Sequence, residues 1–356
     1  MNEIENLILN LRSVAAQLKL NYHISLLSNT RSNTRELNNS LISYSTNNEF
    51  FSDEEFDEVF EGIKGADFFV EPFYNEIEFI LVTLKESYYK NKQFVYNLSR
   101  NGQHVGKKSL IPSFCDLMSI PYTGSDALVI SFSRAKYFYT KYLENHNVKV
   151  PNSWVYDPLN GWLAGNKPKL DTKIIIKPMH ESASIGLSES SIRMYDSRTE
   201  LNIMNESINI NSPILVQQFI EGYECEVPLL ISNKPYALNP IGISINGENH
   251  LKQSILTYER SYNDSYNFYS LNTELSGSVV EKVKSTATDI AQLVGLRSYG
   301  RVDFRIDNQG TAYLMDIAAS PYTTKHSSFA FAFNQLGLEY HDIYSSIIGL
   351  SSKKTH

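Results

Sequence analysis

The chain has little of what several classes of protein require. Its only cysteines, Cys115 and Cys225, exclude a disulfide scaffold and a zinc site built from cysteines. No apolar run approaches the length of about 18 residues that marks a membrane-spanning helix. Basic residues are few, since 32 Lys and Arg stand against 39 Asp and Glu and leave a net charge of −7. A binder of nucleic acid or of anionic membranes would be basic, so we expect neither partner.

Residues 1–5 lack the basic and apolar segments of a signal peptide, and with so few cysteines we expect a cytoplasmic protein. The 356 residues are enough for two or three domains, and a hydrophobic fraction of 42% is enough for a full core. What is abundant is aromatic residues, with 23 Tyr and 18 Phe. Such a surplus suits sugar binding, stacking on nucleic acid, or only a bulky core.

Helices and strands are expected to alternate over roughly the first 120 residues. Apolar residues recur at helical spacing over 4–18, and Ser52 with Glu55 forms a capping box before a second apolar face. Short strands are expected at 23–27, 68–70 and 94–96, and a loop at 28–50. The alternation predicts an α/β unit with a parallel sheet.

Further along the chain, helices are expected over 126–146 and 279–294. Strands are expected at 173–176 and 214–216, and a hairpin pairs 300–306 with 312–317. Residues 246–275, which we call the lid segment, are polar and rich in tyrosine. A segment of that length between strands is typical of a lid.

The hairpin carries the first chemical pattern. Arg301, Asp303 and Arg305 share one strand face, because side chains alternate along a strand. The returning strand brings Asp316 alongside Asp303. Two carboxylates beside an arginine suit Mg²⁺ and phosphate. Solvated charges on an exposed strand are the simpler alternative for this pattern taken alone.

Two further patterns follow strands. Lys177 ends one strand, and the small residues after it let backbone N–H groups approach an anion, although the Walker P-loop sequence is absent. After 214–216 comes a polar and aromatic hinge suited to an adenine, and Glu224 beyond it suits ribose hydroxyls. An ordinary turn explains either pattern when it is taken alone.

Together and in this order, the patterns resemble the D-alanine–D-alanine ligase family of the ATP-grasp superfamily, from about residue 93 to 348. The matching segments are Ile120-Pro121-Tyr122-Thr123-Gly124-Ser125, Lys136, Ile176-Lys177-Pro178 with Glu181 and Ser184-Ile185-Gly186, Val216 to Glu224, Arg301-Val302-Asp303 with Asp316, and Ser320-Pro321 with His326-Ser327-Ser328. The resemblance implies an α/β fold, in part α+β, of the ATP-grasp type. It implies three domains, at 1–122, 123–220 and 221–356, with the nucleotide between the last two.

The resemblance also implies roles for the matching residues. ATP is expected to contact Lys136, Lys177, Glu181, the backbone of 182–184 including Ser184, Gln217, Phe219, Ile220 and Glu224. Asp303 and Asp316 are expected to hold one or two Mg²⁺ ions. Arg301 is expected to stabilise an acyl phosphate and then an oxyanion. Ser327 lies where the family's second substrate places its carboxylate. The implied reaction phosphorylates a carboxylate with ATP, after which an amine displaces phosphate to give an amide.

Several positions depart from the family pattern. The third metal ligand is replaced by Ala318, and the phosphate-binding lysine of the lid by Ser261, with Arg260 one residue earlier. Tyr322 stands where the family has a glycine, and Ala183 replaces a serine that orders the first substrate. With Tyr258, Tyr262, Tyr266 and Tyr269 of the lid segment, Tyr322 is expected to place several aromatic rings around the acceptor site, beside Ser328, and to reshape it for a substrate larger than alanine.

The first-substrate region departs most. The glutamate loop that holds an ammonium group in the family is absent, and residues 98–108 instead supply Arg100, Lys107 and Lys108. These cations point toward an anionic or differently shaped acid, unless they are solvated loop charges. We therefore expect a ligase of specialised metabolism that joins a small carboxylic acid to an amino acid. The alternatives are a true D-alanine–D-alanine ligase of cell-wall synthesis and a catalytically weak ATP-binding homologue. The resemblance also implies a homodimer.

Overall fold

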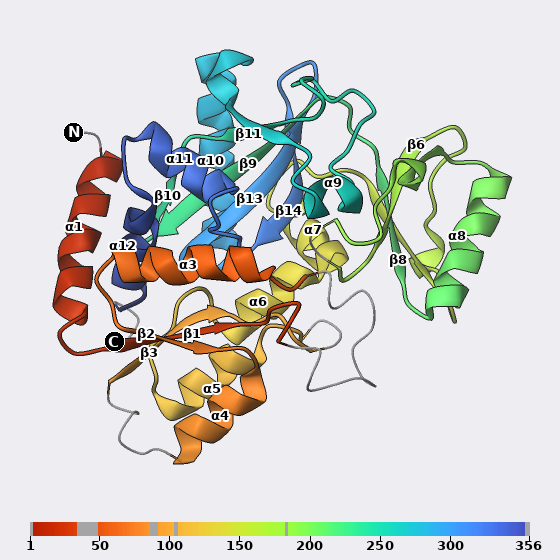
Figure 1. Ribbon diagram of the computed structural model, residues 1–356. Coiled ribbons are helices and arrows are strands. Elements are labelled where there is room, and N and C mark those ends of the chain that lie inside the picture. The colour runs from red at the N-terminus through yellow and green to blue at the C-terminus, as the bar shows by residue number, and fades with distance from the viewer. Residues whose placement is uncertain (1–2, 34–48, 86–91, 103–105, 182–183, 353–356) are drawn as a thin grey trace.

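The computed structural model describes residues 3–33, 49–85, 92–102, 106–181 and 184–352, and Figure 1 shows three sheets with helices packed around them. The N-terminal part alternates helix and strand as predicted. Its elements are α1 (Glu3–Leu18), β1 (His23–Ser28), α3 (Asp53–Gly65), β2 (Val70–Phe73), α4 (Glu76–Lys85), β3 (Gln93–Leu98) and α5 (Leu110–Met118). The three strands form a parallel sheet in the order β2-β1-β3, which confirms the predicted parallel unit.

Local sequence explains where these elements begin. The capping box of α3 is present: Ser52 Oγ accepts from the Glu55 N–H at 3.1 Å, and Glu55 accepts from the Ser52 N–H at 2.7 Å. The strand expected at 68–70 is wrong, because pairing with β1 starts only at Val70. Phe69 is 73% exposed and leads into the strand instead. Most of the loop expected at 28–50 lies outside the described residues.

The single helix predicted over 126–146 is two helices in the structure. The segment 126–146 forms α6 (Ala127–Arg134) and α7 (Lys136–Glu144), and Ala135 between them has a ψ of 66°, which is not helical. In a continuous helix, side chains two residues apart point about 200° apart. The break lets Arg134 and Lys136 both face the same cavity.

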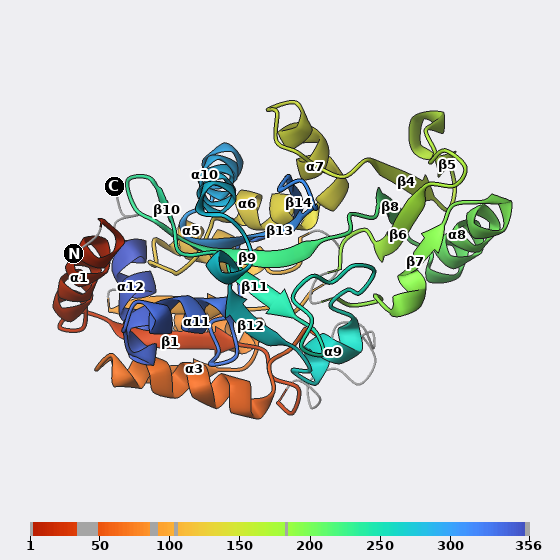
Figure 2. The ribbon, with the colours of Figure 1, turned by 90° about the horizontal axis from the view of Figure 1, so that it is seen from above.

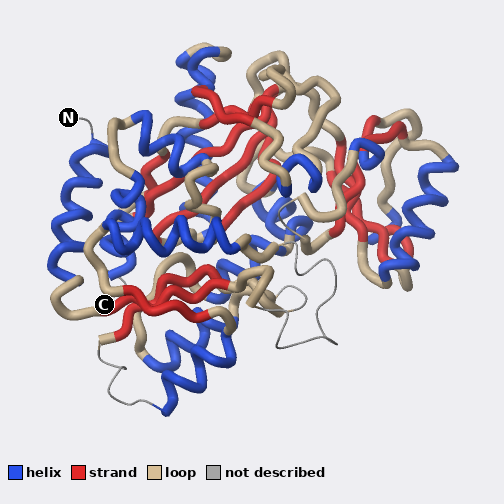
Figure 3. Tube along the Cα trace, viewed as in Figure 1, coloured by secondary structure: helices blue, strands red, loops and turns tan. Residues whose placement is uncertain are grey.

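A five-stranded antiparallel sheet follows, in the order β5-β4-β8-β6-β7, with one helix packed along it (Figure 2). Its elements are β4 (Ser153–Asp157), β5 (Gly161–Trp162), β6 (Lys173–Pro178), β7 (Ile192–Met194), α8 (Ser197–Ile210) and β8 (Ile214–Gln218). Ile203 of α8 packs with Ile174, Ile176, Ile214 and Val216 in one small core. This sheet stands apart from the N-terminal sheet in Figure 3.

The largest sheet is antiparallel, in the order β12-β11-β9-β13-β14, with β10 beside β9. Its elements are β9 (Tyr223–Ile231), β10 (Pro235–Ala237), β11 (Ile241–Ser244), α9 (Tyr258–Tyr262), β12 (Asn267–Ser270), α10 (Gly277–Val294), β13 (Ser298–Ile306), β14 (Ala312–Ala318), α11 (Ser328–Gln335) and α12 (Tyr340–Ser351). In Figure 2, α10 covers one face, and α11 and α12 cover the other. The lid segment is not all loop, because it contains α9 and β12.

The first and last helices pack against each other. Ile8, Leu11 and Ala15 of α1 share a core with Ile343 and Ile347 of α12. The helices approach closely at Gly349, where an added Cβ would lie 2.6 Å from the Leu11 carbonyl oxygen. None of the helices in the described ranges is long and apolar enough to cross a membrane.

Candidate active site

A cavity with a volume of about 280 Å³ is lined by residues from all three sheets or their connections. Arg301, Asp303 and Arg305 of β13 all line it, so the predicted shared face is confirmed. The alternative of a solvated strand face is wrong for these charges, since Arg305 is only 2% exposed. Asp303 is the direct partner of Asp316 on β14, and the pairing becomes irregular at the next residue. The hairpin thus places two carboxylates side by side at the cavity wall.

Arg301 links two carboxylates that face each other across neighbouring strands. Its Nε and Nη2 donate to the two oxygens of Asp303 at 2.7 and 2.8 Å, and its Nη1 lies 3.0 Å from Glu226 Oε2. Glu226 on β9 pairs directly with Asp303, and like charges in that arrangement repel. Burial raises the pKa of Asp303 to about 7, against the attraction of Arg301 and with the help of Glu226. A cation bound here would therefore reduce the repulsion between the carboxylates of Asp303 and Glu226.

Two lysines face the second carboxylate. Lys136 Nζ lies 2.7 Å from Asp316 Oδ1, and Tyr139 Oη donates to the same oxygen at 3.0 Å. Although burial acts to raise it, Lys136 and these hydrogen bonds hold the pKa of Asp316 below its usual value. Burial and the charge of Lys136 lower the pKa of Lys177 to about 8. An anion such as phosphate would stabilise both ammonium groups together.

The cavity wall also carries an aromatic ring, that of Phe219. The Arg305 guanidinium lies 4.8 Å from the centre of the Phe219 ring, and its Nη1 is 3.9 Å from Glu224 Oε2. Burial raises the pKa of Glu224 and lowers that of Arg305. Of the three predicted adenine contacts, only Phe219 lines the cavity. The side chain of Gln217 turns away, where its Nε2 donates to Ser153 Oγ at 3.0 Å, and Ile220 is buried elsewhere.

The lid segment contributes Tyr258, Ser261, Tyr262 and Tyr266 to the cavity wall. Tyr269 was expected with them, but its ring lies over Gly242, where a Cβ would come within 2.2 Å of it. Arg260 does not line the cavity, because it pairs with Glu189 and donates to the Ile255 carbonyl at 2.8 Å.

Of the remaining predicted residues, most line the cavity and one does not. Glu181, Ser184, Tyr322 and Ser327 line the cavity, whereas Ser328 is fully buried and does not. The Ser327 hydroxyl caps α11, accepting from the Ala330 N–H at 3.2 Å and donating to the Thr324 carbonyl at 2.6 Å. Residues 182 and 183 lie outside the described part of the chain.

The two carboxylates of the hairpin are the candidate ligands for a metal ion. In the described ranges, no group of three His, Cys, Asp or Glu side chains has the arrangement of a metal site. Ala318, in the position of the family's third ligand, lines the cavity without a donor atom. Mg²⁺ commonly binds one or two protein carboxylates and completes its shell with phosphate oxygens and water. Asp303 and Asp316 fit that arrangement when a nucleotide's phosphates lie beside Lys136 and Lys177.

The sequence did not indicate several of the charged residues at or beside the cavity, among them Arg31, Glu49, Arg134 and Glu226. Glu226 carried a usable signal, because it follows Glu224 by two residues on a strand and so shares its face. Arg134 was not predicted, because in an unbroken helix over 126–146 it would point away from Lys136. Nothing in the local sequence marked Glu49 or Arg31, which reach the site through tertiary contacts.

Solved structures identify the fold. D-alanine–D-alanine ligase from Bacillus anthracis, complexed with ATP, matches 94% of this chain over 98% of its own, with a TM-score of 0.71 and 17% identity. This likeness confirms the predicted fold class. The chain therefore belongs to the class of proteins with the ATP-grasp fold.

The family follows from the sequence comparisons. The family described as "D-ala D-ala ligase C-terminus" matches residues 156–349, which is more than half of the chain. The chain therefore belongs to the D-alanine–D-alanine ligase family. It is 26% identical to the D-alanine–D-alanine ligase of Bordetella petrii, over 70% of this chain and 74% of that protein. It is 27% identical to that of Carboxydothermus hydrogenoformans, over 76% and 84%.

Proposed function

We propose that this protein is an ATP- and Mg²⁺-dependent ligase that joins a carboxylic acid other than D-alanine to an amino acid, in specialised metabolism. The observation that carries the proposal is the pairing of Asp303 with Asp316 opposite two lysines in one cavity. In this proposal Lys136 and Lys177 bind the phosphates of ATP. Phe219 contacts the adenine, and Glu224 accepts hydrogen bonds from the ribose.

Arg301 is proposed to stabilise the negative charge that develops on the reacting carboxyl group. It is fixed by the two oxygens of Asp303 and by Glu226, so little reorganisation is needed when that charge appears. Asp303 and Asp316 would hold Mg²⁺, which neutralises phosphate charge when it is bound. Most of the rate enhancement would come from this positioning and charge neutralisation. The proposed domains remain 1–122, 123–220 and 221–356, and a homodimer remains a prediction.

The charge distribution argues against a homologue that has lost its chemistry. Lys177 is half-buried beside another lysine, and two cations placed so close together destabilise a fold unless an anion binds there. A protein without phosphate chemistry would gain stability by losing Lys177. The true D-alanine–D-alanine ligase remains the main competitor, because the relatives carry that name.

A turnover assay separates these functions. The protein is incubated with ATP, Mg²⁺ and pooled small acids and amino acids, and ADP, phosphate and new amide masses are measured. We expect ADP and an amide from an acid other than D-alanine. Turnover with D-alanine alone would identify a cell-wall ligase. Tight ATP binding without ADP from any pool would identify a weak homologue.

A pair of lysine variants localises the activity to the cavity. Lys177→Met should remove most of the turnover, because one phosphate contact is lost. Lys64→Met is the matched control, since Lys64 is half exposed, lies outside the cavity lining and forms its ion pair with Glu61 one helical turn away. Equal activity of the two variants would contradict the proposed phosphate site.

A further inference from the structure

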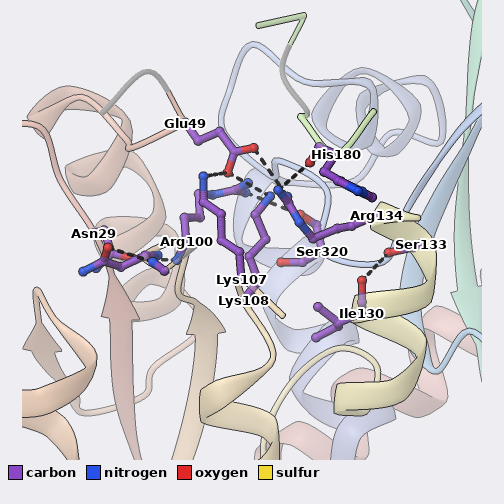
Figure 4. A network of polar contacts seen from close by, with 12 residues as sticks. Asn29, Glu49, Arg100, Lys107, Lys108, Ile130, Ser133, Arg134, His180 and Ser320 are labelled. Atoms are coloured by element: carbon purple, nitrogen blue, oxygen red, sulfur yellow. Dashed lines mark hydrogen bonds and ion pairs between the residues drawn. The ribbon is translucent and has the colours of Figure 1, made fainter. Parts of the chain in front are cut away.

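Several cations gather beside the cavity with one carboxylate, and we call Arg100, Lys107, Lys108, Arg134 and Glu49 the basic cluster (Figure 4). Glu49 Oε2 lies 2.8 Å from Lys107 Nζ and 3.4 Å from Lys108 Nζ, and Glu49 Oε1 lies 3.5 Å from Arg134 Nη1. Three of the cations thus share one carboxylate, whereas Arg100 makes no ion pair within the described residues. Arg100, Lys108 and Arg134 also line the cavity, so their positive charge faces the substrate space.

These charges are not solvated. Glu49 is 0%, Arg100 4% and Lys107 5% exposed, so the alternative of loose loop charges is wrong. Burying a cation is unfavourable unless an anion compensates for it. Glu55 also lines the cavity; burial raises its pKa, the charges of Arg31 and Arg100 act to lower it, and its carboxylate accepts from the Ser52 N–H. Glu181 is another carboxylate of the cavity wall, but it makes no ion pair with these cations or with others within the described residues.

Arg100 is held in place without being neutralised. Its guanidinium lies 4.3 Å from the centre of the Tyr322 ring and 4.8 Å from that of Phe51. Nη2 donates to the Ser320 carbonyl at 3.4 Å, while Nε is buried and has no hydrogen-bond partner among the described residues. Within those same residues, Arg100 forms no ion pair with a carboxylate. A fixed, buried donor facing a cavity is suited to bind an anionic group of a ligand.

The position of Arg100 relates it to the reacting end of the substrate. Ser320, which accepts from Arg100, follows closely after Asp316 and Ala318 of β14, and all three line the cavity. An acid lying along β14 would therefore present one end to Arg301 and Asp316 and its other end to Arg100. An ammonium group at that second end would be repelled by the basic cluster.

We propose that the acid activated by this ligase carries a second carboxylate, which binds to Arg100 with Lys108 and Arg134 of the basic cluster. The proposal rests on the proposed ligase function and adds the substrate class. A carboxylate is the group that Glu49 already presents to the same cations. Tyr322, where the family has glycine, is a positioning residue in this arrangement because its ring fixes the Arg100 guanidinium.

Matched acids test the proposal in the full chain. Butanedioate is compared with butanoate, and aspartate with 2-aminobutanoate, so that each pair differs by the second carboxylate. Binding is measured by calorimetry without ATP, and kcat/KM is measured with ATP, Mg²⁺ and pooled amino acids. We expect the dianionic member of a pair to be preferred by on the order of ten- to a hundredfold, as for a charge-assisted hydrogen bond.

Variants assign the preference to Arg100. Arg100→Met should reduce the preference ratio about tenfold or more, and Arg100→Lys should retain part of it, while the KM for ATP stays constant. Arg297→Met is the control, because Arg297 is 59% exposed and pairs with Asp126 away from the cavity. Thermal melts check that each variant is folded. The preference ratio is informative because a general loss of packing would lower kcat/KM for both acids of a pair alike.

The outcomes separate the two proposals. Amide formation with both acids of each pair at equal efficiency would overturn the second-carboxylate proposal and leave the ligase function standing. An unchanged ratio in folded Arg100→Met would overturn the role of the basic cluster. No ADP from any acid, together with no dianion binding by calorimetry, would overturn both. Dianion binding that is lost in Arg100→Met, without any ADP, would support the site and refute the ligase function.

Discussion

Replacing Glu49 by glutamine is the most direct test of the buried charge balance. Glu49 is completely buried and compensates Lys107, Lys108 and Arg134 at 2.8, 3.4 and 3.5 Å. Glutamine keeps the shape but removes the charge, so three buried cations lose a shared counter-charge. Breaking a buried ion pair by removing one partner costs about 3–5 kcal/mol. We expect Glu49→Gln to lower the free energy of unfolding by that amount.

The measurement is denaturant unfolding followed by fluorescence, with Glu61→Gln as the control. Glu61 also pairs with a lysine, but its side chain is 64% exposed, and such surface pairs contribute about 1 kcal/mol or less. Adding Lys108→Met to Glu49→Gln should restore part of the lost free energy of unfolding, because one uncompensated cation is removed. A loss no larger than that of Glu61→Gln would refute the reasoning.

The same variant has a pH signature. Although burial acts to raise it, the three cations hold the pKa of Glu49 well below its usual value. A depressed carboxyl pKa stabilises the fold above the unfolded pKa of about 4.3, and this contribution is lost as pH falls through the folded pKa. Glu49→Gln should lack that acid-sensitive component. Burial lowers the pKa of Lys108, so the variant should recover stability as pH rises and Lys108 loses its proton. Identical pH profiles for the native protein and the variant would contradict this assignment.

Four further predictions concern the cavity. Asp303→Asn should lower turnover about a hundredfold or more, measured as ADP release, and full turnover would remove Asp303 from the metal site. Ala318→Asn should raise the affinity for Mg²⁺ if a ligand is missing, and an unchanged Mg²⁺ titration would show that another group already occupies the position. Tyr322→Gly should change the preferred substrate in a competition assay, and an unchanged preference would rule out a role for its ring. ATP affinity should fall as pH rises above the Lys177 pKa of about 8, because only the ammonium form attracts phosphate; calorimetry showing constant affinity to pH 9 would contradict this.

The parts that sequence predicted well are those governed by local rules. The hairpin of β13 and β14 was predictable because alternation and antiparallel return place Asp303 opposite Asp316 without knowledge of the rest of the chain. The break at Ala135 was not, since it follows neither proline nor glycine. It arises because burial of Arg134 and Lys136 at one cavity overrides local helix propensity.

The adenine contacts show a second limit. Gln217 and Phe219 are two residues apart, and an extended strand would place them on one face. Because β8 ends at Gln218, the alternation does not continue to Phe219, and only Phe219 reaches the cavity. The basic cluster shows a third limit, since Glu49 meets cations from two distant segments that no local pattern connects.

The packing of α1 on α12 has a consequence for folding. Ile8, Leu11 and Ala15 of α1 are far apart in sequence from their partners Ile343 and Ile347 of α12. Contacts between such distant residues form late, because closing a long loop costs entropy before the contact is gained. The apolar stripe of α1 therefore stays exposed during folding until α12 is in place.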